Sequence, residues 1–273
     1  MSFDDRRRNV RSLLFFLVAL LGTVVLSFAG SFAGAADRDV ALGPRYSPTA
    51  QDQALPPNPE ARPGPRVALT FDDGPSPQLT PYILDVLAAK RVRATFFLQG
   101  DNTEARPELV ERIHREGHVV ANHAWDHAWF PDLTAAEAEE EITRTNEVLQ
   151  DITGVRPTLF RYPFGQPSPD GDAVLARLGM SNGVHWKWTS NKPGDFQCPG
   201  ADALVDYVVT EATDQAMILL HDAGDTIGCP PAQLDYLPRA IDELRARGFV
   251  FGVVAPSPVP SPLNGGSRAA VVP

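Results

Sequence analysis

The sequence predicts an α/β fold in which parallel strands form a distorted (β/α) barrel. Short apolar runs alternate with amphipathic helical stretches, a pattern typical of a parallel sheet covered by helices. About seven strands alternate with helices within one domain, and this number favours an irregular barrel over an open sheet. The reactive residues of such a fold are expected where strands end.

The expected elements follow one another from residue 66 to residue 254. Strands are expected at residues 66–71, 94–100, 118–122, 158–162, 183–188, 216–221 and 249–254. Helices are expected near residues 81–90, 107–115, 172–178, 201–212 and 237–247, with one further long helix that begins at Thr134. This long helix begins with a capping box, because Thr134 and Glu137 are spaced to satisfy each other's backbone amides.

The first 36 residues have the pattern of an export signal. Arginines at positions 6, 7, 8 and 11 precede an uncharged apolar run from Ser12 to Ala36, and small residues at 33–35 suit cleavage by a signal peptidase. Left uncleaved, residues 12–36 are long enough to tether the protein to a membrane. The protein is therefore expected to be secreted or extracytoplasmic, and membrane-anchored if the signal remains.

Two proline-rich segments flank the expected domain. Residues 37–65 lack apolar periodicity and are interpreted as a linker, and residues 256–273 as a disordered tail. The folded domain is then expected to comprise residues 66–255.

Charge and cysteine content narrow the range of partners. A net charge of −10 argues against binding to nucleic acid through phosphate neutralisation, and a monomer is expected. Cys198 and Cys229 are the two cysteines, and in an exported protein they are expected to form a disulfide. A metal-binding or nucleophilic role is the alternative, although neither cysteine lies in a cluster with ligand spacing.

The segment TFDDGP, residues 70–75, places two adjacent carboxylates at the end of the first expected strand. Because neighbouring side chains diverge there, Asp72 and Asp73 can serve different partners. A hydrolase that activates water on a metal needs this division, with one carboxylate on the ion and one to accept the proton. The alternative is a solvated acidic turn.

The segment NHAWDH, residues 122–127, supplies His123 and His127 at a spacing that can direct two imidazoles to one ion. Together with Asp73 they form a set of two histidines and one carboxylate. Such a set leaves a coordination position open and is typical of catalytic zinc.

Two further segments end expected strands with polar residues. FRYPFG, residues 160–165, contains Arg161, whose guanidinium can hold a carboxylate, and a proline-constrained turn that can present a backbone N–H to an oxyanion. A structural salt bridge and turn explain it equally well. ILLHD, residues 218–222, ends with His221 in a place where a general acid or base can reach a cleft.

These four segments, in this order, resemble the NodB-type polysaccharide deacetylases of carbohydrate esterase family 4, and the resemblance extends from Val67 to Val254. It implies a NodB homology domain with a distorted barrel and one divalent metal. The roles that it implies are Asp72 as general base, Asp73, His123 and His127 as metal ligands, Arg161 as the group that orients Asp72, the backbone N–H of Phe164 as oxyanion donor, Leu219 as part of the acetyl pocket, and His221 as general acid.

The sequence departs from the family pattern at two places. Ala124 stands where the family usually has a Ser or Thr that braces the metal loop, which predicts weaker metal binding or a looser loop. The family's Asp-Trp pair is matched only by Asp195-Phe196, a few residues late, so Asp195 is the candidate partner of His221. Trp186 and Trp188 nearby are interpreted as core packing rather than sugar stacking.

The resulting hypothesis is a metal-dependent hydrolase that removes N-acetyl groups from peptidoglycan or chitin-like oligomers. An exported enzyme meets its own cell wall first, which favours peptidoglycan. Zinc suits the ligands, and cobalt, nickel or manganese could occupy them as well. The alternatives are an O-acetyl esterase acting on xylan-type polysaccharide and a catalytically idle wall-binding protein.

Overall fold

The structure is a computed structural model that describes residues 46, 63–181, 184–260 and 267–273. The expected signal peptide or membrane anchor at residues 1–36 lies outside the described residues. So does the expected linker, apart from Tyr46 and residues 63–65. Within the described part of the chain, no helix combines the length and the apolar character that a membrane span requires.

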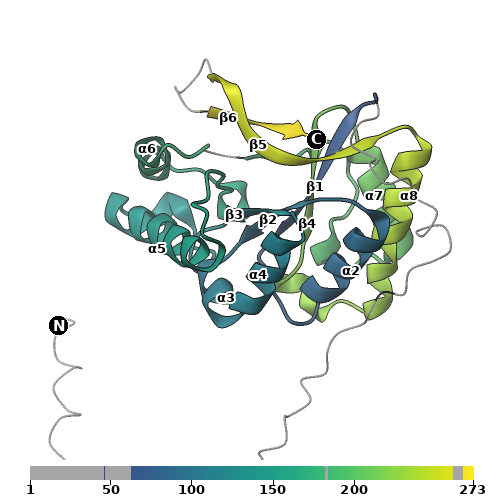
Figure 1. Cartoon of the computed structure of the whole chain (residues 1–273), viewed down its shortest axis with the longest axis horizontal. Coiled ribbons are helices and arrows are strands. Elements are labelled where there is room, and N and C mark those ends of the chain that lie inside the picture. The colour runs from purple at the N-terminus through teal and green to yellow at the C-terminus, as the bar shows by residue number, and fades with distance from the viewer. Residues whose placement is uncertain (1–45, 47–62, 182–183, 261–266) are drawn as a thin grey trace, which may run out of the picture. The chain divides into compact units, whose positions relative to one another are not determined.

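The α/β fold class is confirmed, with β1 (Arg66–Asp72) as the central strand (Figure 1). Along one edge β1 pairs in parallel with β4 (Ala216–His221). Along the other edge it pairs first with β5 (Val250–Pro260) and then with β2 (Thr95–Leu98). The remaining parallel strand, β3 (Val119–Asn122), lies beside β2.

Two expected strands, at residues 158–162 and 183–188, do not form regular ladders, so that prediction was wrong for them. Single backbone hydrogen bonds nevertheless connect β3 to β4 through these two segments. The amide of Arg161 donates to the carbonyl of Asn122 at 3.1 Å, that of Val184 to Phe160 at 3.1 Å, and that of Lys187 to Met217 at 2.9 Å. Pro157 and Pro163 bracket the first segment and limit regular pairing there, because proline has no amide to donate.

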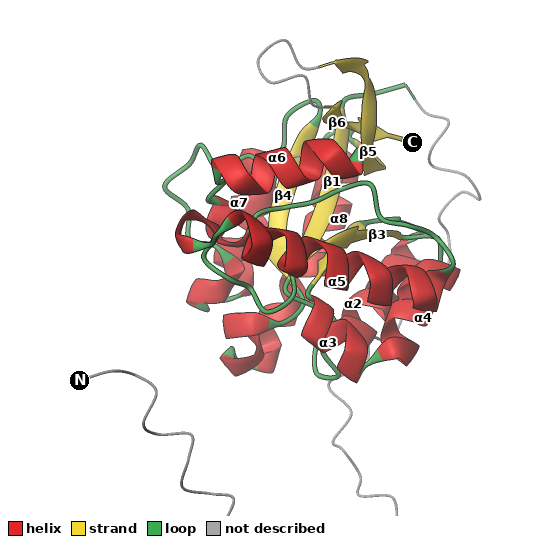
Figure 2. Cartoon of the chain, turned by 90° about the vertical axis from the view of Figure 1, so that its left-hand side faces the viewer, coloured by secondary structure: helices red, strands yellow, loops and turns green. Residues whose placement is uncertain are grey.

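Helices cover the parallel strands β1, β3 and β4, and β5 and β6 (Ser267–Val272) extend beyond them (Figure 2). The helices are α2 (Thr80–Lys90), α3 (Gly100–Ala105), α4 (Pro107–Arg115), α5 (Ala135–Thr153), α6 (Pro169–Leu178), α7 (Ala201–Glu211) and α8 (Tyr236–Ala246). The capping box at Thr134 is present at the start of α5. The short helix α3 was not expected from the sequence.

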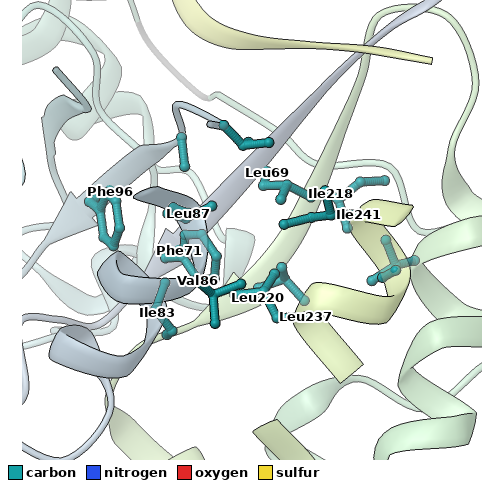
Figure 3. Close-up of a cluster of buried hydrophobic side chains, with 14 of the residues drawn as sticks. Leu69, Phe71, Ile83, Val86, Leu87, Phe96, Ile218, Leu220, Leu237 and Ile241 are labelled. Atoms are coloured by element: carbon teal, nitrogen blue, oxygen red, sulfur yellow. The ribbon is translucent and has the colours of Figure 1, made fainter. Parts of the chain in front are cut away.

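The core follows the alternation of side chains along the strands. Leu69 and Phe71 of β1 and Ile218 and Leu220 of β4 pack with α2 and α8, as Figure 3 shows. The intervening residue Ala68 belongs instead to a second buried cluster that includes Phe97, Ala121, Leu159 and Val184 from β2, β3 and the two irregular segments. The side chains on one face of β1 therefore pack against helices, and those on the other face lie inside the barrel.

The prediction of a disordered tail was wrong for residues 256–260, which are the last part of β5, and for residues 267–272, which form β6, antiparallel to β5. Val271 is buried in the cluster that fills the barrel, and its amide donates to the side chain of Gln215 at 3.2 Å. Gly252 of β5 makes the pairing close, because a Cβ there would lie 2.2 Å from the carbonyl oxygen of Val272. Burial of the apolar end of β6 thus outweighs the proline-rich composition that suggested disorder.

Candidate active site

The carboxyl ends of three parallel strands bring the sequence motifs together. Asp72 is the last residue of β1 and is in register with His221, the last residue of β4. His123 follows β3 directly. The segments TFDDGP, NHAWDH and ILLHD therefore meet at one edge of the sheet, as expected for a parallel α/β fold.

Asp73, His123 and His127 form a cluster in which the candidate ligand atoms all lie within 4.8 Å of one another. Asp73 Oδ1 is 3.3 Å from Nε2 of each histidine. Asp73 and His127 have φ angles of 72° and 63°, a left-handed backbone conformation that residues other than glycine seldom adopt. Such backbone strain is typical of functional sites, and here it accompanies the convergence of two side chains on one point.

The chemistry of this cluster fits a divalent cation. Nδ1 of His123 lies 2.8 Å from the carbonyl oxygen of Arg161, which can only accept, so Nδ1 is the donor and Nε2 is free to ligate. Burial raises the pKa of Asp73, but the hydrogen bond and charge of His123 more than offset this and hold that pKa below its usual range. Burial lowers the pKa of His127, which favours the neutral, ligating form.

Asp72 is held by the buried side chain of Arg161. Its Oδ1 accepts a hydrogen bond from Nη1 of Arg161 at 2.6 Å, and its Oδ2 lies 3.8 Å from Nε2 of His123. Arg161 is itself fixed by Thr70 Oγ1 at 2.9 Å and by the carbonyl of Val184 at 2.9 Å. The bond from Oδ1 to Arg161 thus fixes the orientation of the Asp72 carboxylate, while Oδ2 faces the metal cluster.

His221 and Asp195 form a second pair. Asp195 Oδ1 is 2.7 Å from Nδ1 of His221, and Oδ2 accepts the backbone amide of His221 at 2.7 Å. Burial lowers the pKa of His221, but the negative charge and hydrogen bond of Asp195, aided by Asp73 and Asp72, raise it to about 9. A histidine with this pKa keeps its proton at neutral pH and can act as an acid.

Asp195 belongs to a short 3-10 turn, Asp195–Gln197, rather than to a strand. Its carbonyl oxygen accepts the side-chain amide of Gln233 at 2.9 Å. A disulfide between Cys198 and Cys229 ties the same turn to the segment before α8. These contacts explain how a residue that is displaced along the chain still reaches His221.

The metal cluster, Asp72 and His221 line one cavity of about 580 Å³. Its lining also includes Leu219, Phe164, Trp186 and Trp188. Trp186 and Trp188 are half-buried and line this cavity. Trp188 also packs against the main core cluster, as the sequence interpretation expected for it. Phe164 has a φ of 57° and an exposed side chain.

The loop that contains Ala124 is braced without a hydroxyl at that position. The amide of Ala124 donates to Asn122 Oδ1 at 2.7 Å, and its carbonyl accepts the amide of Gly100 at 3.0 Å. Glu141 of α5 accepts the amide of Trp125 at 2.8 Å. The sequence reasoning missed Asn122, although it directly precedes the first histidine, and Glu141, for which the local sequence gives no signal.

Asp222 is a further buried carboxyl that the sequence reasoning did not consider. It accepts a hydrogen bond from Thr80 Oγ1 at 2.6 Å, and its amide donates to the carbonyl of Asp72 at 3.1 Å. A Cβ on Gly74 would lie 2.2 Å from both carboxyl oxygens of Asp222, so this side chain packs directly beneath the turn that follows Asp73. Burial raises the pKa of Asp222 to about 7.

Comparison with known proteins shows which family the chain resembles. Residues 60–183 match the family described as polysaccharide deacetylase. A chitooligosaccharide deacetylase of Sinorhizobium fredii is 39% identical over 205 residues, which cover 68% of this chain and 89% of that one. A peptidoglycan-N-acetylglucosamine deacetylase of Listeria monocytogenes is 33% identical over 79% of this chain and 43% of its own length.

A solved structure shares the fold as well. The family 4 carbohydrate esterase from Streptomyces lividans, in complex with acetate, superposes with a TM-score of 0.63 at 32% identity and covers 77% of this chain and 98% of that one. The chain belongs to the polysaccharide deacetylase family, carbohydrate esterase family 4, and is a hydrolase of carbon–nitrogen bonds in linear amides.

Proposed function

We propose that this protein removes N-acetyl groups from a cell-wall polysaccharide in a metal-dependent reaction. The observation that supports this most is the meeting, in one cavity, of the Asp73 cluster, the Arg161-bound carboxylate of Asp72 and His221, whose ring is paired with Asp195 behind it. An amide needs both activation of its carbonyl and protonation of a poor amine leaving group. The three groups together meet both needs.

The metal would be held by Asp73, His123 and His127. When bound, a divalent ion supplies Lewis-acid activation of the acetyl carbonyl and of water. Two histidines and one carboxylate suit zinc best, and cobalt, nickel or manganese are accommodated by the same donors.

The remaining steps fall to the chain's own side chains. Asp72 accepts the proton from the attacking water, and its ion pair with Arg161 keeps it oriented for that transfer. The backbone N–H of Phe164 donates to the developing oxyanion, and Leu219 packs against the acetyl methyl group. His221 then gives its proton to the departing amine, and Asp195 stabilises the charged form of the imidazole.

The proposed substrate is peptidoglycan or a chitin-like oligomer. Relatives named for each of these substrates resemble the chain over two thirds or more of its length. The export signal expected at residues 1–36 favours the cell wall, with the enzyme secreted or held at the membrane by an uncleaved signal.

Hydrolysis of O-acetyl esters is a second candidate activity of the same site, because the similar solved structure is named an esterase and an ester needs the same metal site. Acetate release from peptidoglycan, chitin oligomers and acetylated xylan, with and without a chelator, tests both candidates. Chelator-sensitive release from a glycan with N-acetyl groups is expected. Release from acetylated xylan alone would support the esterase, and release by metal-free protein would refute the mechanism.

A further inference from the structure

A row of aromatic rings leads outward from the metal cluster. The ring centroids of His123 and His127 are 5.2 Å apart, those of His127 and Phe164 4.3 Å, and those of Phe164 and Trp129 5.5 Å. The row therefore begins at a buried candidate ligand and ends at an exposed tryptophan. Neither the metal site nor the proton transfers require its outer part.

The outer two rings expose apolar surface beside the cavity. Trp129 is 44% exposed and Phe164 is 56% exposed, and the other large hydrophobic side chains exposed among the described residues are Val155 and Ile227. These two exposed aromatic rings contact each other, and Phe164 lines the cavity, so together they form an apolar patch of the kind that marks a binding site.

The surface that these rings form is firmly supported. Trp129 immediately precedes a 3-10 helix, Phe130–Asp132, whose first residue is fully buried. Phe130 packs edge-on against Phe160 and Tyr162 in the cluster that includes residues of α5 and α6. Phe164 follows Tyr162 by two residues in the turn Pro163–Gly165. Both exposed rings are thus attached to a well-packed base, which limits the entropy lost on binding.

We propose that Trp129 and Phe164 form a platform that binds the sugar unit next to the one that loses its acetyl group. The inference rests on the proposed function of the adjoining site. Its occupant follows from continuity, because Phe164 lines the catalytic cavity and touches His127. A polymer whose acetyl group enters the cavity beside His127 extends over these rings, and the apolar C–H face of a pyranose matches an aromatic surface.

The platform makes the enzyme selective for glycan length. A single sugar occupies the cavity without reaching Trp129, whereas a longer chain gains the contact with the platform. Trp129 is the residue to vary, because the backbone amide of Phe164 also belongs to the proposed oxyanion site. Val155 provides a matched control, since it is an equally exposed apolar side chain, 57% accessible, in the turn after α5.

Binding of the tetramer of N-acetylglucosamine, measured by calorimetry on the full chain with Asp72→Asn to prevent turnover, tests the proposal. Adding Trp129→Ala is expected to weaken binding about tenfold, because an aromatic contact of this kind contributes on that order. Trp129→Phe, which keeps a ring, is expected to lose less, and Val155→Ala to match the parent. Unchanged affinity with Trp129→Ala would overturn the proposal.

The dependence of catalysis on chain length gives a second readout. With Asp72 intact, the ratio of kcat/KM for the tetramer to kcat/KM for the single sugar is expected to fall about tenfold in Trp129→Ala. An equal loss on both substrates would overturn the platform, and so would a dimer that Trp129→Ala dissociates, because a second copy would then cover the rings. If tetramer binding depends on Trp129 but the protein with Asp72 intact releases no acetate, the proposed function is refuted and the platform is not.

Discussion

The two halves of the candidate site are positioned by different means. In the metal half, Asp72, Asp73 and His123 lie at or directly after the ends of β1 and β3, and His127 lies in the loop that follows β3. The acid half, His221 and Asp195, joins the end of β4 to a 3-10 turn 26 residues earlier in the chain. Strand register places the metal half, whereas a disulfide and the side chain of Gln233 fix the turn of the acid half. Each half can therefore be disturbed separately.

The largest effect is expected in the metal half. Asp72→Asn should lower turnover on the order of 10³-fold, because it removes the proton acceptor, while metal content stays unchanged. His123→Ala should lose both metal and activity. Acetate release and metal stoichiometry of the two variants distinguish a base from a ligand, and near-full activity of Asp72→Asn would contradict the assignment.

Asp195→Asn should change the pH dependence of the acid half. In the proposed mechanism His221 acts in its protonated form, and Asp195 is the strongest influence that raises its pKa to about 9. Without that charge the pKa of His221 falls. The alkaline limb of the activity profile therefore moves to lower pH. A shift of one pKa unit lowers kcat/KM by up to about tenfold on the alkaline side and changes it little near pH 6.

The pH profile of kcat/KM for wild type and Asp195→Asn measures this shift, and Asp206→Asn on the exposed face of α7 serves as a control. An alkaline limb that does not move would contradict the role of Asp195.

Removing the disulfide should affect the acid half more than the metal half. Cys198→Ser combined with Cys229→Ser is expected to lower the free energy of unfolding by about 3 kcal/mol, as for other disulfides that close loops of similar length. The Asp195 turn then loses one of its supports, so amide hydrolysis should fall several-fold, on the order of 1 kcal/mol. Denaturant unfolding measures the first effect and acetate release measures the second. A loss of metal in the same variant would show that the halves are not independent.

The smallest effect is expected for Ala124→Ser. Asn122, Gly100 and Glu141 already satisfy the backbone of this loop, so restoring a hydroxyl should change metal affinity by less than about twofold. Glu141→Ala should weaken metal binding more, since it leaves the amide of Trp125 without its acceptor. Competition with a chelator ranks the two variants, and a large gain with Ala124→Ser would show that the loop lacks rigidity.

The sequence was most informative where one motif held both the residue and its position. TFDDGP and NHAWDH end regular strands, so the parallel fold alone brought Asp72, Asp73 and His123 together. Asp195 was uncertain because contacts with Gln233 and Cys229, distant in sequence, determine where its turn lies.

The fold was predictable to a similar degree. Regular strands that are buried along most of their length, such as β1 and β4, appear in the sequence as apolar runs and were found with their approximate bounds. The proline-bracketed segment at 158–162 was overestimated as a strand, and β6 was missed because its pairing with β5 depends on burial of Val271 in the barrel. Glu141 was missed for the same kind of reason. It lies 16 residues along the chain from Trp125, whose backbone amide donates a hydrogen bond to it.

The division of work between the two halves is tested most directly with His221→Ala. Its acetate release is measured on the N-acetylglucosamine tetramer and on acetylated xylan, with metal content determined in parallel. We expect unchanged metal content, a loss on the order of 10²-fold or more on the amide, and a much smaller loss on the ester, because an alkoxide leaving group depends less on protonation before it departs than an amine does. Equal, small losses on both substrates would contradict the assignment of His221 as the acid for amide cleavage.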